Sequence, residues 1–109
     1  MLTVSTIEDF SNLIRENRGV LFYFSTVSCS VGEAVEPKVR QLLSEKYPKL
    51  IYCTVDMNVS PELCGLNQVF VEPTILLFLE GKEAMRVSRN IGMIQLENSL
   101  SRLYQLAFE

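Results

Sequence analysis

The stretch VLFYFSTVSCSVGE, at residues 20–33, combines a strand, a turn and the start of a helix. Residues 20–24 are a dense run of β-forming residues, short enough to be a fully buried strand. Serine and threonine follow as turn and cap residues, and an amphipathic helix is expected from about Ser30. Cys29 is therefore predicted at a helix N-terminus, where unpaired backbone N–H groups and the helix dipole favour a thiolate. The stretch thus predicts one position suited to nucleophilic chemistry.

Apolar strands and amphipathic helices alternate on both sides of this stretch. Strands are expected at residues 1–5, 20–24, 50–56, 74–79 and 83–89, and helices at residues 7–17, 30–47, 60–66 (or from residue 58) and 93–107. Thr6 is the expected N-cap of the first helix, Gly19 its expected end, and Pro37 an expected kink in the second helix. The order β-α-β-α-β-α-β-β-α predicts an α/β fold in which helices cover both faces of a central mixed sheet. The length predicts a single domain over residues 1–109.

The composition excludes several classes of function. A net charge of −3 with dispersed basic residues gives no footprint for nucleic acid, and no segment is apolar enough to span a membrane. The chain has no histidine, which argues against His-assisted catalysis and most zinc sites, so neither a metal nor another cofactor is expected. Three cysteines without a disulfide pattern, and an N-terminus without signal-peptide features, favour a reducing, cytoplasmic location. Cys53 and Cys64 are expected to be small buried core residues.

Several residues with characteristic spacing carry a resemblance to a known family. They are Phe24 five residues before Cys29, Pro37 eight residues after it, Val55-Asp56 at the end of a strand, and Pro73-Thr74 at the start of the next. With these residues on the predicted element order, the chain resembles a thioredoxin over essentially its whole length. The resemblance implies the thioredoxin-like fold and a cis Glu72–Pro73 bond beside Cys29. It also implies a glycine near the active site, expected to be Gly92.

The expected active site departs from the family pattern. The second cysteine of the family's Cys-x-x-Cys motif is Gly32 here, so the motif reads Cys-Ser-Val-Gly, and the usual tryptophan before the first cysteine is Ser28. The family's buried aspartate, which manages protons near the cysteine pair, corresponds to Tyr23, and its lysine partner to Tyr52. A resolving thiol and its proton relay are thus both missing from the motif.

The resemblance and these departures together predict a protein with at most monothiol thiol–disulfide exchange activity in cell redox homeostasis. Cys29 would be the nucleophile acting on a protein thiol or disulfide partner, and an external thiol such as glutathione would replace the missing resolving cysteine. The expected partner-binding residues are Ser28, Ser30, Gly32, Glu72, Pro73 and Gly92.

Two other interpretations remain open. The first is a thioredoxin-fold binding module without catalysis, which would use the Cys29/Pro73 surface for a protein partner. The second is a peroxidase, because residues 26–29 match the Thr-x-x-Cys core of peroxiredoxins. The upstream proline of peroxiredoxins is absent, however, and the chain is short for that family.

Two acidic residues bear on the reactivity of Cys29. Glu33 stands where the family usually carries a basic residue, and Glu72 precedes the expected cis-proline. Carboxylates at ~7 Å from the sulfur would repel a thiolate by roughly 1–2 kcal/mol each, against ~0.3–1 kcal/mol, or ~2 when partly buried, from the helix terminus. We therefore expect the pKa of Cys29 to lie near or above its usual value of about 8.5. We also expect Glu72 to favour basic partner segments.

Overall fold

The computed structural model describes residues 2–26 and 30–109, with residues 30–34 described by their backbone alone. Within these residues the elements follow the predicted order. They are β1 (Leu2–Thr3), α1 (Ile7–Glu16), β2 (Gly19–Ser25), α2 (Ser30–Lys46), β3 (Ile51–Asp56), α3 (Pro61–Asn67), β4 (Thr74–Leu79), β5 (Lys82–Ser88) and α4 (Met93–Phe108). In the described part of the chain, no helix is both long enough and apolar enough to cross a bilayer.

The strands form one mixed sheet in the order β1-β3-β2-β4-β5, which confirms the predicted fold class. β1 and β2 run parallel to β3, whereas β4 runs antiparallel to β2 and β5 antiparallel to β4. The pairing brings Ser25 opposite Asp56, and Thr74 opposite Ser88. Four chain segments therefore meet at one end of the sheet, which we call the Ser25 end.

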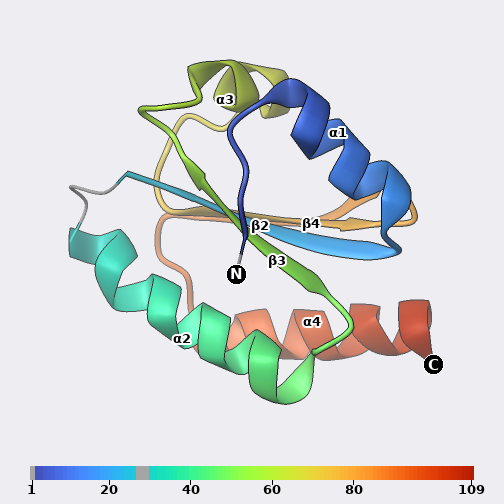
Figure 1. Cartoon of the computed structure of the whole chain (residues 1–109). Coiled ribbons are helices and arrows are strands. Elements are labelled where there is room, and N and C mark those ends of the chain that lie inside the picture. Colours follow the sequence, from blue (N-terminus) through green and yellow to red (C-terminus); the bar gives the residue numbers. More distant parts are fainter. Residues whose placement is uncertain (1, 27–29) are drawn as a thin grey trace.

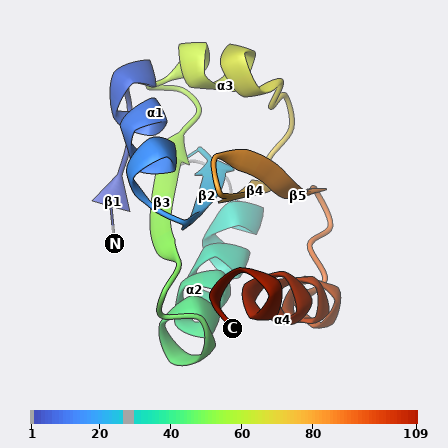
Figure 2. The same ribbon diagram turned by 90° about the vertical axis from the view of Figure 1, so that its right-hand side faces the viewer.

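Helices cover both faces of the sheet, as predicted (Figure 1). α1 and α3 lie on one face and α2 and α4 on the other, and the view in Figure 2 shows the same two layers edge-on. Each face has its own apolar core, because the fully buried residues of β2 alternate between the two sides. On the α1/α3 side the core includes Phe10, Phe22, Phe24, Cys53, Leu63 and Cys64. On the α2/α4 side it includes Leu21, Tyr23, Val39, Ile75, Leu96 and Leu100.

The ends of the first helix show one confirmed and one wrong prediction. Thr6 is the N-cap of α1, and its hydroxyl accepts a hydrogen bond of 3.1 Å from the Asp9 N–H. Gly19 does not end the helix, because α1 ends at the extended C-cap Asn17 and Gly19 is already the first residue of β2. The glycine is needed for packing instead, since a Cβ at this position would lie 2.6 Å from Leu50 Cδ2. Pro37 lies inside α2, as expected.

Candidate functional site at the Ser25 end of the sheet

Glu72 joins the loop before β4 to the segment that follows β2. The Thr26 N–H donates to Glu72 Oε2 at 2.6 Å, and the Thr26 hydroxyl donates to Glu72 Oε1 at 3.1 Å. Both carboxylate oxygens therefore accept hydrogen bonds from a residue three positions before Cys29. The Glu72–Pro73 bond is cis, the isomer that the resemblance implies. The same carboxylate binds Thr26. Its attraction of basic partner segments stays a prediction.

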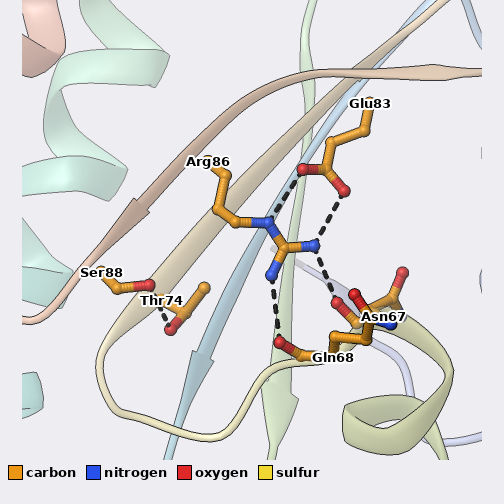
Figure 3. A network of polar contacts seen from close by, with 6 residues as sticks. All are labelled: Asn67, Gln68, Thr74, Glu83, Arg86 and Ser88. Atoms are coloured by element: carbon orange, nitrogen blue, oxygen red, sulfur yellow. Dashed lines mark hydrogen bonds and ion pairs between the residues drawn. The ribbon is translucent and has the colours of Figure 1, made fainter.

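β5 holds the same loop from the other side. The Arg89 N–H donates to the Pro73 carbonyl at 2.9 Å. The Thr74 hydroxyl donates to the Val71 carbonyl at 2.6 Å and lies 3.0 Å from the Ser88 hydroxyl (Figure 3). The loop that carries Glu72 and Pro73 is thus bonded both to the residue after β2 and to the end of β5.

Arg86 of β5 binds the far end of this loop, where α3 stops (Figure 3). Its guanidinium donates to the carbonyls of Asn67 at 2.7 Å and Gln68 at 3.2 Å, and it forms two bonds of 2.9 Å with the Glu83 carboxylate. These bonds to Arg86 hold the pKa of the Glu83 carboxyl below its usual value. Arg86 therefore fixes residues 67–68, the first part of the loop, against the sheet.

Gly92 directly precedes the last helix, where the resemblance implies a glycine. It is the N-cap of α4, with an ordinary φ of −80°. The residue bonded to Pro73 is Arg89, whose φ of 64° lies in the left-handed region that favours glycine. Arg89 and Gly92 therefore both belong to the loop between β5 and α4, and the place of Gly92 relative to Cys29 stays a prediction, because Cys29 lies outside the described residues.

A groove lies between α2, the β5–α4 loop and α4. Its volume is about 530 Å³, and its lining residues are Val35, Val87, Arg89, Asn90, Ile91, Gly92, Gln95, Leu96 and Ser99. Gly92 belongs to this groove, and a Cβ there would lie 2.0 Å from Gln95 Oε1. The groove borders α2, the helix whose first residue follows Cys29 in the chain.

Two tyrosines occupy the positions that correspond to the family's buried aspartate and its lysine. Tyr23 is fully buried, and the Tyr52 hydroxyl donates to Glu36 Oε2 at 2.8 Å. Burial, and next its bond to the Glu36 carboxylate, strongly raise the pKa of Tyr52, which keeps the phenol neutral. Arg40 Nε lies 3.7 Å from the same oxygen of Glu36. A carboxylate supplied by α2 is therefore present beside Tyr52, although neither strand position is acidic.

The two described cysteines are buried core residues, as expected. Cys53 lies mid-strand in β3 and Cys64 in α3, both in the core on the α1/α3 side. Burial raises the pKa of Cys53 to about 11 and also raises the pKa of Cys64. Both thiols are therefore protonated at neutral pH, the form that does not attack a disulfide.

The remaining predicted site residues differ in how much the structure says of them. Ser28 and Cys29 lie outside the described residues, and Ser30 and Gly32 are described only as backbone in the first turns of α2. Glu72, Pro73 and Thr26 are brought together, whereas Gly92 is placed on the groove. Thr26 is marked in the sequence only by the Thr-x-x-Cys match, and no pattern there assigns a role to Arg86 or Arg89. Arginines within a predicted edge strand are too common to indicate such contacts. Among residues 2–26 and 30–109, no group of three or more His, Cys, Asp or Glu side chains could hold a metal ion.

Comparison with known proteins agrees with this architecture. The thioredoxin family model matches residues 1–102. The thioredoxin-like protein YdfQ of Bacillus subtilis is 30% identical over 106 residues, which cover 97% of this chain and 94% of that protein. Thioredoxin-1 of Saccharomyces cerevisiae is 28% identical over 82 residues, which cover 75% of this chain and 79% of that protein. The structure of Fasciola hepatica thioredoxin superposes with a TM-score of 0.85 at 27% identity, covering 94% of this chain and 98% of that one. The chain belongs to the thioredoxin family.

Proposed function

We propose that this chain is a monothiol thiol–disulfide exchange protein with Cys29 as its nucleophile. Its substrates are disulfides of protein partners, and its location is a reducing compartment such as the cytoplasm. The partner-binding surface consists of residues at the Ser25 end of the sheet and the start of α2. These residues are Ser28, Ser30, Gly32, Glu72 and Pro73, with Gly92 at the groove.

The chemistry follows from a single thiol in the motif. The Cys29 thiolate attacks one sulfur of the partner's disulfide, which forms a mixed disulfide and releases the other sulfur as a thiolate. Gly32 cannot attack this mixed disulfide, so an external thiolate such as that of glutathione attacks it instead. The Cys29 thiolate is then released, and the external thiol leaves joined to the partner sulfur. After this second exchange Cys29 is again the thiolate with which the reaction began.

The observation that supports a monothiol mechanism most directly is the state of the other two cysteines. Cys53 and Cys64 are buried in the core on the α1/α3 side, and burial raises the pKa of both. Neither can supply a resolving thiolate at neutral pH without partial unfolding of that core.

The test uses a variant in which Cys53 and Cys64 are replaced by alanine and Cys29 is the single thiol. The rate of iodoacetamide alkylation, measured from pH 6 to pH 10, gives the pKa of Cys29. We expect this pKa at about 8.5 or above, with a rate that rises about tenfold per pH unit below it. Incubation with a glutathionylated peptide should transfer glutathione to Cys29, detected by mass spectrometry, and the Cys29→Ser form should show no transfer.

A second function, binding of a protein partner without catalysis, is favoured by the Thr26–Glu72 contact. That contact holds a carboxylate three residues before Cys29 in the chain, where negative charge opposes a thiolate. If Cys29 is alkylated slowly even at pH 9 and accepts no glutathione from the peptide, monothiol exchange is wrong and the binding module is the better description.

A further inference from the structure

Arg89 has a backbone conformation that its side chain does not favour. Outside glycine, a positive φ is found in the described residues at Gln68, Glu80 and Arg89. Gln68 is the left-handed C-cap of α3, and Glu80 lies in the two-residue turn between β4 and β5, so local structure explains both. Arg89 instead follows the last residue of β5, where its N–H bonds to the Pro73 carbonyl. An arginine at a position better suited to glycine suggests that its side chain has a use.

The guanidinium of Arg89 is available for binding. Arg89 is exposed, and among the described residues its side chain forms no hydrogen bond or ion pair. This distinguishes it from Arg18, Arg40 and Arg86, each of which lies against a carboxylate. In a chain with a net charge of −3, Arg89 offers an uncompensated positive charge beside the candidate site.

The groove that Arg89 lines suits a small amphipathic anion. Its volume of about 530 Å³ lies within the usual range for small-molecule sites. Its walls include the apolar side chains of Val35, Ile91 and Leu96, and none of the described residues that line it is acidic. Asn90, Gln95 and Ser99 supply neutral hydrogen-bonding groups.

The start of α4 adds to the positive potential of the groove. Its N-cap is Gly92, which offers no side-chain cap, and its first turn carries no acidic residue. The helix dipole is therefore not compensated at this end. This contribution is secondary to the guanidinium, which can pair with a carboxylate through two parallel hydrogen bonds.

We propose that the groove binds a small peptide thiol of the glutathione class, with Arg89 pairing with one of its carboxylates. The proposal rests on the proposed function, since it names where the external thiol of the exchange reaction binds. Arg89 is then a residue that determines specificity for anionic thiols, and it takes no part in bond breaking.

The exchange that this binding would serve is balanced in atoms and electrons. Cys29 first takes a glutathionyl group from a protein mixed disulfide and releases the protein thiolate. The thiolate of a second glutathione attacks the glutathione sulfur of the Cys29 adduct, so one S–S bond forms and one breaks. The products are glutathione disulfide and the Cys29 thiolate. The sulfur of the second glutathione is oxidised and the protein sulfur is reduced to a thiol, while the sulfur of the first glutathione stays at the disulfide level throughout.

The test is a titration of the full chain with S-methylglutathione, in which binding is measured by calorimetry or by changes in amide chemical shifts. This probe has both carboxylates but no free thiol, so binding is measured without any exchange at Cys29. The proposal can therefore fail while the proposed exchange reaction holds, and the reverse is also true. In the Arg89→Gly variant we expect binding to weaken about fivefold, the loss of one exposed charge-assisted pair. We expect its thermal midpoint to stay the same or to rise, because glycine suits the left-handed φ.

The controls separate charge pairing from other causes. Arg102→Ala removes an exposed arginine of α4 that does not line the groove, and should leave binding unchanged. S-methylglutathione diethyl ester should bind the native chain and Arg89→Gly equally weakly, because it has no carboxylate to pair. Equal binding of S-methylglutathione to the native chain and Arg89→Gly would overturn the proposal. So would equally tight, Arg89-dependent binding of an acidic peptide unrelated to glutathione, because the groove would then recognise carboxylates of proteins.

Discussion

At the scale of single residues, Gly19 and Gly65 offer a test position and a control position for the same glycine-to-alanine substitution. A Cβ on Gly19 would lie 2.6 Å from Leu50 Cδ2, 3.0 Å from the Phe108 side chain and 3.1 Å from the Leu79 side chain. Gly19→Ala must therefore push apart a buried contact between β2 and the core on the α2/α4 side. We expect it to lower the free energy of unfolding by about 1–3 kcal/mol, measured by urea denaturation.

The control for this substitution is Gly65→Ala in α3, where a Cβ meets no heavy atom within 4 Å. Alanine is favoured over glycine inside a helix, so this variant should be more stable by about 0.5–1 kcal/mol. If both variants lose stability to the same extent, crowding at Gly19 does not explain its effect.

At the scale of elements, Arg86 joins β5 to the end of α3. The Glu83 carboxyl has a lowered pKa because Arg86 bonds to its ionised form. This contribution to stability is present above the ordinary carboxyl pKa of 4.5 and is lost as the pH falls through the lower pKa of the folded state. We expect Arg86→Met to reduce the free energy of unfolding by about 0.5–1.5 kcal/mol at pH 7, a value limited by the partial exposure of both side chains.

Acid should narrow the difference between Arg86→Met and the native chain without removing it. Protonation of Glu83 weakens one part of the network, while the bonds from Arg86 to the carbonyls of Asn67 and Gln68 remain. Urea denaturation at pH 7 and at pH 3 measures both differences. A Glu83→Gln control should lose less at pH 7, since it keeps the carbonyl bonds. A loss for Arg86→Met that grows on acidification would contradict this account.

At the scale of the whole molecule, stability should fall in alkali. The pKa of Cys53 is raised to about 11 from an ordinary value of 9.0 by burial, and the pKa of Tyr52 is raised as well. Between pH 9 and pH 11 the Cys53 thiol loses its proton in the unfolded chain but keeps it in the folded chain, so unfolding becomes easier as the pH rises. We expect the free energy of unfolding to decrease by on the order of 1–2 kcal/mol between pH 9 and pH 11. Urea denaturation with a reductant present measures this decrease.

Cys53→Ala provides the control, because it removes the titrating thiol from β3. This variant should be less stable at pH 7, since it leaves a cavity, but its stability should decline less between pH 9 and pH 11. An equal decline in the variant and the native chain would show that Cys53 does not control the alkaline slope.

The elements could be predicted from the sequence because each has its own apolar periodicity. Every residue of the run at 20–24 is buried, as its β-forming character predicted. The end of α1 lies within one residue of its expected place, but the role predicted for Gly19 is wrong, because packing against Leu50 rather than a helix stop requires this glycine. The contacts of Glu72, Arg86 and Arg89 could not be predicted. They join exposed or half-buried polar residues that lie far apart in the sequence, and no periodicity marks such pairs.

The division of the interior by the sheet has a consequence for how this chain can diverge. Side chains on opposite faces of the sheet share few neighbours, so substitutions on the two sides should be nearly independent in their effects. The groove lies on the α2/α4 side, and Cys53 and Cys64 lie in the other core. Variation in the groove can therefore accumulate without repacking the buried cysteines. A lineage can acquire a new ligand on one face while the opposite half of the interior drifts separately.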